Sequence, residues 1–292
     1  MNARSDHPVH VNSSPQGPDL AQTPIWTPWV YGEDGVALDD PAEEFHEASK
    51  LSPNIFDPRV PGPSLLENKP EIRASTVRAV KRQSHLPSVR LPAPALPQVS
   101  FESVIEARRS ERALGSDQLA LPHLSALLHA AYGVTHHIDG IGHPLRAIPS
   151  AGALYPLEIY PVCLNVDGLE PALYHFDPLR GVLERIRAGD LRAELEGLTV
   201  YPELFTTAAT VFFVTAMFWR TRFKYGLRGY RFALLEAGHM GQNFVLTSTA
   251  LGLESVPVGG FYDRRVDGFL GVDGVNEASL YAVSVGSTAL DE

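Results

Sequence analysis

The chain has 292 residues, of which 44% are hydrophobic and 20% charged, so it can bury the core of one large domain or two small ones. Its 34 acidic and 24 basic side chains give a formal net charge of −10, which disfavours a general binder of nucleic acids or membrane surfaces. A single cysteine excludes an internal disulfide framework, and no apolar leader or 18-residue apolar run occurs, so we expect a soluble cytoplasmic protein.

The first hundred residues are predicted to contain little regular structure. Residues 1–24 are polar and proline-rich, and we expect a disordered tail there. Residues 25–99 are predicted to form an N-terminal arm, because the dense prolines of 61–97 favour extended backbone and block long helices. One short helix is predicted within this arm, over 39–51, with acidic residues at its start. The remaining residues, 100–292, are predicted to form the folded domain.

The folded domain is predicted to begin with two helices. Ser100 is a suitable N-cap for a helix over FESVIEARR, and Pro122 suits the start of a second helix that Gly133 ends. Strands are then predicted over 157–166, 172–177, 182–186, 210–218, 254–258 and 280–285, with helices over 230–251 and around 266–270. Because helices and strands mix without strict alternation, the fold class is α+β and not a doubly wound sheet.

Several common catalytic motifs are absent from the sequence. There is no GxGxxG after a strand, no P-loop, no GxSxG elbow and no HExxH pair. The His136-His137 pair adjoins Asp139 in a glycine-rich stretch, and we interpret it as a solvated loop in preference to a metal site. Cys163 lies in an apolar, strand-like run and is interpreted as a buried, unreactive thiol.

The stretch RRSER, residues 108–112, places three guanidinium groups and a hydroxyl at the end of the first helix. Arginine offers planar, bidentate donors, so this cluster could hold a phosphate. The alternative is that cations at a helix C-terminus only complement the helix dipole. The residues alone favour that alternative.

Two glycine-containing stretches are candidates for close contact with a ligand. In IPSAGALYPLEIY, residues 148–160, small side chains precede a strand, where backbone N–H groups can approach a flat or anionic ligand. In VPVGGFYD, residues 256–263, a glycine pair follows a strand. A plain tight turn is the alternative for the first stretch, and for the glycine pair the residues alone favour a turn.

The stretch FKYGLRGYR, residues 223–231, combines Lys224 and Tyr225 with nearby arginines at 220, 222, 228 and 231. If these cations are also close in space, their repulsion favours a neutral lysine and an ionised tyrosine, which can act as a proton relay. A solvated basic loop is the alternative. Ala237, Gly238 and Gly241 give the helix that follows a narrow face, suited to close packing or to a ligand.

Together these motifs, in this order, resemble the SagB-type flavin-dependent dehydrogenases of the nitroreductase superfamily. The resemblance runs from about Ser100 to Gly286, and FHEASKL (45–51) resembles a short element that precedes the core in that branch. Its most specific pieces are RRSER, PSAGALYP, ALYHFDPLRGVLERI, KYGLRGYR followed by EAGHMGQN, and VPVGGF followed by LYAVSVG.

The resemblance implies a nitroreductase-like three-layer sandwich, with a mixed or antiparallel sheet flanked by helices, in an intertwined homodimer with FMN at the subunit interface. The cofactor-binding residues that it implies are Arg108, Arg109, Ser110, Arg112, Pro149, Ser150, Ala151, Gly152, Gly259 and Gly260. The Pro149–Gly152 element is expected to reach the flavin from the partner subunit. Lys224 and Tyr225 match the catalytic Lys-Tyr pair of azoline-oxidising relatives. Glu236 is expected to pair with Arg231 or Arg228.

The implied activity is oxidation of a thiazoline, oxazoline or similar ring in a peptide-derived natural product, with hydride transfer to flavin N5 and proton abstraction by the Lys-Tyr pair. Two alternatives stay open: a nitro- or quinone-type reductase driven by a nicotinamide cofactor, and an inactive flavin-binding scaffold in a biosynthetic complex. The sequence departs from classical nitroreductases in VGSTALDE, which lacks the basic residues that help hold the phosphate. The substrate, the electron acceptor and any partner enzymes are not specified by the sequence.

Overall fold

A computed structural model describes residues 41–51, 68–76, 79–115, 117–138 and 143–288, so the predicted disordered tail lies outside the described residues. The chain divides into two compact units, residues 1–50 and residues 51–292. In the first unit, helix α2 (Pro41–Ala48) confirms the short acidic helix expected within 39–51. All the elements described below belong to the second unit.

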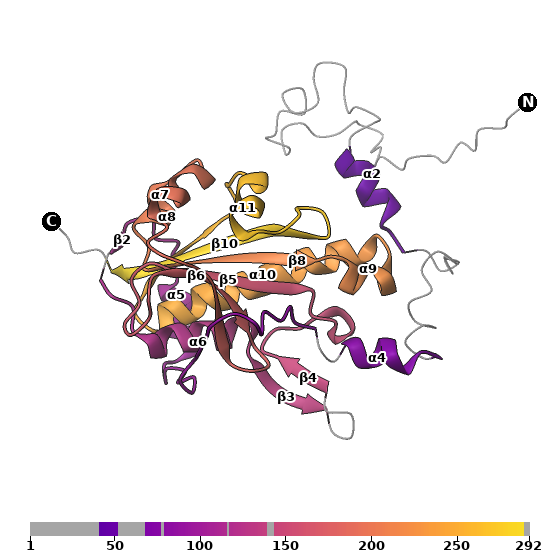
Figure 1. Ribbon diagram of the computed structural model, residues 1–292, viewed down its shortest axis with the longest axis horizontal. Coiled ribbons are helices and arrows are strands. Elements are labelled where there is room, and N and C mark those ends of the chain that lie inside the picture. Colours follow the sequence, from indigo (N-terminus) through magenta and orange to yellow (C-terminus); the bar gives the residue numbers. More distant parts are fainter. Residues whose placement is uncertain (1–40, 52–67, 77–78, 116, 139–142, 289–292) are drawn as a thin grey trace, which may run out of the picture. The chain divides into compact units, whose positions relative to one another are not determined.

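The second unit is built on an eight-stranded antiparallel sheet (Figure 1). The strand order is β1-β7-β6-β5-β8-β10-β2, and β9 also pairs with β10. The strands are β1 (Ser88–Arg90), β2 (Leu114–Gly115), β5 (Leu157–Cys163), β6 (Ala172–Asp177), β7 (Val182–Ala188), β8 (Thr210–Met217), β9 (Glu254–Val258) and β10 (Glu277–Thr288). A separate hairpin joins β3 (Val134–Ile138) to β4 (His143–Arg146).

Helices cover the sheet on both faces and give three layers. The helices are α4 (Pro70–Thr76), α5 (Phe101–Ala107), α6 (Leu121–Tyr132), α7 (Arg192–Leu195), α8 (Glu203–Thr206), α9 (Trp219–Tyr225), α10 (Arg228–Ala250) and α11 (Asp263–Leu270), with 3-10 turns η1 (Ala151–Ala153) and η2 (Glu196–Leu198). Alternate residues of the central strands supply two hydrophobic cores. Phe212 and Val214 of β8 pack with α6 and α10, whereas Val211 and Phe213 pack with the layer of α7, α8 and α11.

Most of the elements predicted from the sequence are present. Ser100 caps α5, with its hydroxyl accepting the Ser103 N–H at 3.0 Å. Strands β6 and β9 have the predicted bounds, and β8 is buried on both faces as its continuous apolar run predicts. Part of the narrow face of α10 packs within the chain, because a Cβ on Gly241 would lie only 2.5 Å from the Tyr281 ring, whereas Gly238 is exposed.

Three segments differ from their predictions. The proline-rich arm contributes helix α4 and the edge strand β1, which pairs with β7. The loop predicted at His136-His137 is wrong, because both residues lie in β3, although both are exposed as expected. Lys224 and Tyr225 do not lie in a loop before the long helix, since they form the last turn of the separate helix α9.

Strand β10 and helix α10 connect two distant ends of the sheet (Figure 1). At the first end, Glu277 of β10 pairs with Met217 of β8, directly before α9. At the second end, Gly286 of β10 pairs with Glu254 of β9, and β2 adjoins. Nine residues of strand at about 3.3 Å each separate these points by about 30 Å. We call them the Glu277 end and the Gly286 end.

Candidate functional site

The turn at residues 149–156, which leads into β5 at the Glu277 end, has a strained backbone. Gly152, Ala153 and Tyr155 have φ angles of 65°, 52° and 46°, a region that non-glycine residues rarely enter. Ser150 holds the turn closed, because its hydroxyl accepts the Tyr155 N–H at 2.9 Å. His143 donates from Nε2 to the Ala153 carbonyl at 3.0 Å. Such strain persists only where neighbouring contacts determine the conformation, as they do here.

Helix α9 brings Lys224 and Tyr225 against this turn. A Cβ built on Gly152 would lie 2.7 Å from Tyr225 Oη and 2.9 Å from Lys224 Nζ, so only glycine leaves room for both groups. Lys224 Nζ lies 5.1 Å from the centroid of the Tyr225 ring, and Phe232 packs edge-on against that ring. Both side chains are half-buried. The structure therefore joins two predicted motifs that lie about seventy residues apart in the sequence.

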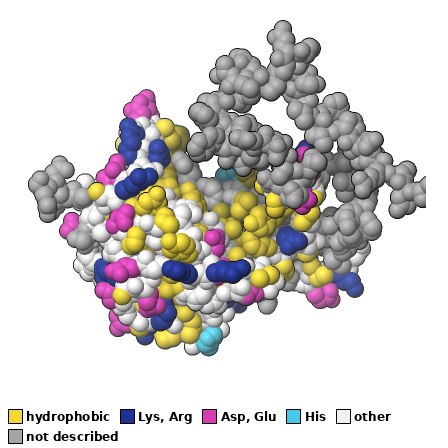
Figure 2. Space-filling model, turned by 90° about the horizontal axis from the view of Figure 1, so that it is seen from above, with side chains coloured by type: hydrophobic (Ala, Val, Ile, Leu, Met, Phe, Trp, Pro, Cys, Tyr) yellow, Lys and Arg dark blue, Asp and Glu magenta, His cyan; other side chains and the backbone are white. Residues whose placement is uncertain are grey.

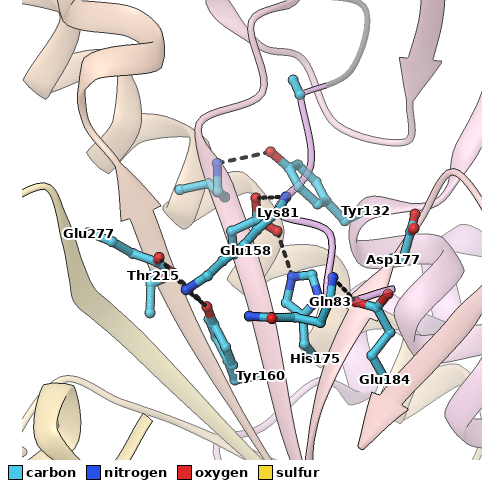
Figure 3. A network of polar contacts seen from close by, with 12 residues as sticks. Lys81, Gln83, Tyr132, Glu158, Tyr160, His175, Asp177, Glu184, Thr215 and Glu277 are labelled. Atoms are coloured by element: carbon cyan, nitrogen blue, oxygen red, sulfur yellow. Dashed lines mark hydrogen bonds and ion pairs between the residues drawn. The ribbon is translucent and has the colours of Figure 1, made fainter. Parts of the chain in front are cut away.

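A buried ionic network supports the turn and α9 from below. Arg220 of α9 pairs with Glu158 of β5, at 2.6 Å between Nη1 and Oε1, and it also donates to the Tyr155 carbonyl at 3.3 Å. Figure 3 shows Glu158 on the other side meeting His175, whose ring also contacts Glu184. Burial alone would raise the pKa of Glu158, but Arg220 and His175 outweigh it and lower the pKa to about 2.

His175 is the second cation of this network, after Arg220. Burial would lower its pKa, but hydrogen bonds to Glu158 at 2.8 Å and Glu184 at 3.0 Å, together with their charges, raise it to about 9. The imidazole is therefore protonated at neutral pH. The network also holds the arm, since the backbone N–H groups of Lys81 and Gln83 donate to Glu158 and Glu184 (Figure 3).

Glu236 of α10 is a buried carboxyl group beside the same turn. Its Oε1 accepts the Tyr132 hydroxyl at 3.0 Å. Burial raises its pKa to about 7, although the hydroxyls of Ser150 and Tyr132 and the charges of Arg146 and Arg220 act in the opposite direction. The sequence predicts a pairing with Arg231 or Arg228. In the structure, the charges of Arg146 and Arg220, which come from other elements, act to lower the pKa of Glu236.

The RRSER cluster lies at the Gly286 end. The Glu111 N–H donates to the Ser255 carbonyl of β9 at 3.0 Å, which fixes the cluster beside that strand. Arg109 turns back to α5 and donates to the Glu106 and Arg108 carbonyls at 2.7 and 2.8 Å, as the helix-capping alternative predicts. Ser110 and Arg112 are exposed, and among the described residues no hydrogen bond or ion pair occupies the Arg112 guanidinium. Arg112 is thus available to an anion.

The predicted glycine pair ends β9. Gly259 and Gly260 are exposed, and a Cβ on Gly259 would meet nothing within 4 Å. Thr199 fixes the Gly260 carbonyl through a 2.7 Å hydrogen bond, and Val200 and Tyr262 beside it are exposed apolar residues. One face of the molecule carries hydrophobic side chains over a broad area, among scattered charged residues (Figure 2).

The candidate residues therefore form two groups in one chain. Pro149, Ser150, Ala151 and Gly152 lie in the turn at the Glu277 end, where Gly152 meets Lys224 and Tyr225. Arg108, Arg109, Ser110 and Arg112 lie at the Gly286 end, and β9 links them to Gly259 and Gly260. The sequence interpretation missed the supporting roles of Glu158, Arg220 and His175, because nothing in an apolar strand pattern marks which polar residue faces a distant partner.

Within the described ranges, no group of three His, Cys, Asp or Glu residues could hold a metal ion. Among the same residues, no helix has both the length and the apolar character needed to cross a membrane. Cys163 is buried, and burial raises the pKa of its thiol to about 12, as expected for an unreactive cysteine.

Comparison with known proteins gives a family for this arrangement. The model of the nitroreductase family matches residues 105–287. MJ1384 of Methanocaldococcus jannaschii, named as a nitroreductase, is 39% identical over 173 residues, which cover 59% of this chain and 85% of that protein. Members of this family are typically flavin-dependent oxidoreductases.

Two further relatives process peptides, according to their names. The microcin B17-processing protein McbC of Escherichia coli is 31% identical over 45% of this chain and 50% of its own length. The trifolitoxin-processing protein TfxB of Rhizobium leguminosarum bv. trifolii is 29% identical over 70% of this chain and 58% of its own length. The chain thus spans only about half of each of these two proteins, and their similarity confirms the SagB-type resemblance.

Solved structures have the same fold. A nitroreductase structure from Anabaena variabilis superposes with a TM-score of 0.60 at 29% identity, over 70% of this chain and 42% of that one. The Escherichia coli microcin synthetase complex McbBCD, solved with truncated pro-MccB17 bound, contains a chain that superposes with a TM-score of 0.53 at 22% identity, over 85% of this chain and 92% of its own. The second likeness concerns the fold alone.

Proposed function

The chain belongs to the nitroreductase family, and we propose that it is an FMN-dependent dehydrogenase that oxidises an azoline ring, a thiazoline or oxazoline, in a peptide-derived natural product. The observation that carries this proposal is the contact of Lys224 Nζ and Tyr225 Oη with the Gly152 turn. A flavin enzyme that removes hydride from carbon also needs a base for the neighbouring proton, and this pair supplies one.

The residues of the chain fit FMN as the cofactor. The exposed guanidinium of Arg112, with the neighbouring Arg108 and Ser110, offers donors for a phosphate. From there β9 leads to Gly259, whose open backbone lets a flat ring approach without a side chain in the way. When bound, FMN supplies the hydride acceptor, its N5 atom.

We propose that the active unit is a homodimer. About 30 Å of strand separates Glu277, whose partner Met217 directly precedes α9, from Gly286, whose end of the sheet carries the RRSER cluster. On this separation we propose that one FMN is held by the cluster of one chain and faces Lys224 of the other. A second copy in antiparallel arrangement brings the Gly152 turn of one chain to the glycine pair of the other. Exposed apolar side chains of α5 and α10 are available for such an interface: Phe101, Ile105, Leu234 and Leu235.

The proposed chemistry assigns one task to each group of residues. The substrate ring loses one carbon-bound hydrogen as hydride and a proton from the adjacent carbon, and the new double bond makes the ring aromatic. Lys224 or Tyr225 takes that proton, and the half-buried position of both limits access of bulk water. The two electrons leave to an external oxidant, by default dioxygen. The Gly152 turn keeps both groups at the reacting edge of the ring.

The relatives support a peptide-derived substrate. McbC and TfxB are named for the processing of microcin B17 and trifolitoxin, and McbC belongs to a complex solved with a truncated pro-peptide. By this analogy, we propose that the protein acts with other enzymes of a biosynthetic complex. A nicotinamide-driven nitro- or quinone-type reductase is the second candidate, and the 39% identity to MJ1384 favours it. Such a reductase has no need of a substrate base.

The proposal is tested with a peptide that carries a synthetic thiazoline. We expect the purified protein to contain FMN and to remove two hydrogen atoms from the probe, as seen by mass spectrometry. Lys224→Ala and Tyr225→Phe should each keep the flavin and slow the oxidation about 100-fold or more. Lys69→Ala, a change at an exposed lysine far from Lys224 in the sequence, serves as the control. A Lys224→Ala protein that keeps FMN and oxidises the probe at the wild-type rate would contradict the proposal, and rapid NADPH-driven reduction of nitroarenes would favour the reductase.

A further inference from the structure

Arg220 is a buried cation at the start of α9, with a side chain only 8% exposed. Its Nη1 lies 2.6 Å from Glu158 Oε1 and 3.3 Å from the Tyr155 carbonyl oxygen. The sequence suggests that Arg220 is one of several cations that tune Lys224. In the structure its charge is instead neutralised by Glu158, so it acts on Lys224 in another way.

Arg220 and Lys224 lie four residues apart in α9, and therefore on the same face of the helix. That face meets the turn at 149–156 at two points. Arg220 contacts the Tyr155 carbonyl, and Lys224 with Tyr225 contacts Gly152. The two contacts together fix the position of α9 along its own axis, relative to the turn, and its rotation about that axis.

Glu158 is a rigid anchor for this contact. It is 2% exposed, and its two oxygens are occupied by Arg220, the Lys81 N–H at 2.7 Å and the His175 ring at 2.8 Å. Figure 3 shows Glu158, on β5, between Lys81 and His175. The carboxylate is ionised at neutral pH, because Arg220 and His175 lower its pKa to about 2. Buried ion pairs contribute little net stability but specify geometry well, which suits a positioning role.

We infer that Arg220 is a positioning residue, whose ion pair with Glu158 and hydrogen bond to Tyr155 hold Lys224 and Tyr225 against the Gly152 turn. Its effect on catalysis rests on the proposed function, because it acts through the proposed base. A misplacement of about 1 Å in a reacting group is enough to cost about 100-fold in rate.

The test compares Arg220→Met, which removes both contacts, with Arg220→Lys, which keeps the charge but loses the planar fork. In the holoprotein we expect kcat for the thiazoline peptide to fall about 100-fold for Arg220→Met and less for Arg220→Lys, with KM changed less than threefold. In a Lys224→Ala/Tyr225→Phe background, Arg220→Met should cause no further loss. A purely structural role would reduce the rate in both backgrounds equally.

A second measurement is independent of the reaction. The rate of acylation of each lysine by an amine-reactive ester, followed by mass spectrometry, should rise several-fold at Lys224 in Arg220→Met and stay unchanged at Lys69. Lys81→Met is the matched control, because it removes the cation from another buried carboxylate, Glu277, and keeps the backbone N–H that donates to Glu158. It should leave kcat and the acylation of Lys224 unchanged.

The possible outcomes separate the two proposals. If wild-type protein does not oxidise the probe, the proposed function fails, and the acylation rates still decide the positioning role. If Arg220→Met leaves the acylation of Lys224 at the wild-type rate, the positioning role is overturned even when the enzyme is active. If Arg220→Met does not fold, Arg220→Lys provides the same two measurements, and wild-type values in both would overturn the inference.

Discussion

The Glu277 end and the Gly286 end of the sheet carry polar residues of the same types in opposite states. At the Glu277 end, Arg220, Glu158 and His175 are buried and paired with one another, and the turn beside them is strained. At the Gly286 end, Arg112 is exposed, and no partner within the described residues occupies its guanidinium. The charges at the Glu277 end have hydrogen-bond partners within the chain and can hold a reacting pair in place. The exposed guanidinium at the Gly286 end has no such partner and can bind a ligand.

This difference has a physical consequence for each end. Buried charges that are fully hydrogen-bonded hold their neighbours in one geometry, which a proton-abstracting pair requires. Exposed arginines are solvated by water in the free protein, so they carry little desolvation cost there. They form charge-assisted hydrogen bonds when a phosphate binds. The predictions below test whether the two ends meet across two copies of the chain, and how rigid each one is.

The largest expected effect is a rescue of activity between two inactive variants. An Arg108→Met/Arg112→Met chain lacks the proposed phosphate donors, and a Lys224→Ala chain lacks the proposed base. If each site combines the Gly286 end of one copy with the Glu277 end of the other, a heterodimer of the two contains one intact site of two. We expect the heterodimer, purified through two different tags, to have about half the wild-type rate, against about 1% for each homodimer.

Two results would contradict this arrangement. Heterodimers that co-purify but have no more activity than the parent variants would mean that both ends serve the same site from one chain. Tagged chains that never co-purify would rule out the dimer itself.

The next largest effect is expected at Gly152. Alanine at this position meets Tyr225 Oη and Lys224 Nζ, which must move. Gly168 is a matched control, because its φ of 69° is close to the 65° of Gly152, but it has nothing within 4 Å of a Cβ. Both changes should destabilise the fold by about 1–2 kcal/mol, the usual strain of a left-handed alanine. Only Gly152→Ala should slow thiazoline oxidation, by about 100-fold. Equal rates for the two variants would show that the contact with the pair is unimportant.

The fold followed closely from the sequence wherever a signal was local. The continuous apolar run of β8 and the cap at Ser100 each depend on residues a few positions apart, and both are present. Helix α9 was not predicted as a helix, because it is seven residues long and is held by tertiary contacts. Thr221 bonds the Gly229 carbonyl at 3.0 Å, and Arg220 bonds Glu158.

The candidate site was predictable as separate pieces but not as an arrangement. The resemblance to a known family identified Gly152 and Lys224 as candidate residues. Nothing in the residues between them indicates that the two lie in contact. The pairing of Arg220 with Glu158 was also out of reach. Which of four arginines near Lys224 turns inward depends on a carboxylate about sixty residues earlier in the chain, on a strand whose pattern is otherwise apolar.

A smaller effect is expected in the pH dependence of stability, through Glu236. Burial raises its pKa to about 7 in the folded protein from 4.5 in the unfolded chain. The folded state therefore keeps a proton that the unfolded state has released, so its stabilisation is complete below pH 4.5 and is lost as pH rises towards 7. The total change is about 3 kcal/mol at most.

Glu236→Gln should remove this dependence. We expect its free energy of unfolding to stay flat between pH 4.5 and 7, where the wild-type value falls. The fall between pH 6.5 and 9 that His175 contributes, with its pKa raised from 6.5 to about 9, should remain in both proteins. Glu203→Gln, at an exposed position, is the control. A Glu236→Gln protein with the wild-type slope between pH 4.5 and 7 would show that this carboxyl group does not stay protonated.

The smallest effects separate the two interpretations of the RRSER cluster. Arg109 donates to two carbonyls at the end of α5, so Arg109→Met should lower the stability of the apoprotein by about 0.5 kcal/mol, as for the loss of exposed helix-end hydrogen bonds. Arg112 makes no such contact, so Arg112→Met should leave the apoprotein melting temperature unchanged and weaken FMN binding about tenfold, the effect of one charge-assisted hydrogen bond. Fluorescence titration with FMN and thermal melts of the apoprotein measure the two quantities separately. The opposite result, in which Arg112→Met binds FMN as tightly as wild type and Arg109→Met does not, would contradict this assignment. It would mean that Arg109 leaves the carbonyls of α5 and turns to the phosphate when FMN binds. The exposed Arg112 would then not be the phosphate donor of the Gly286 end.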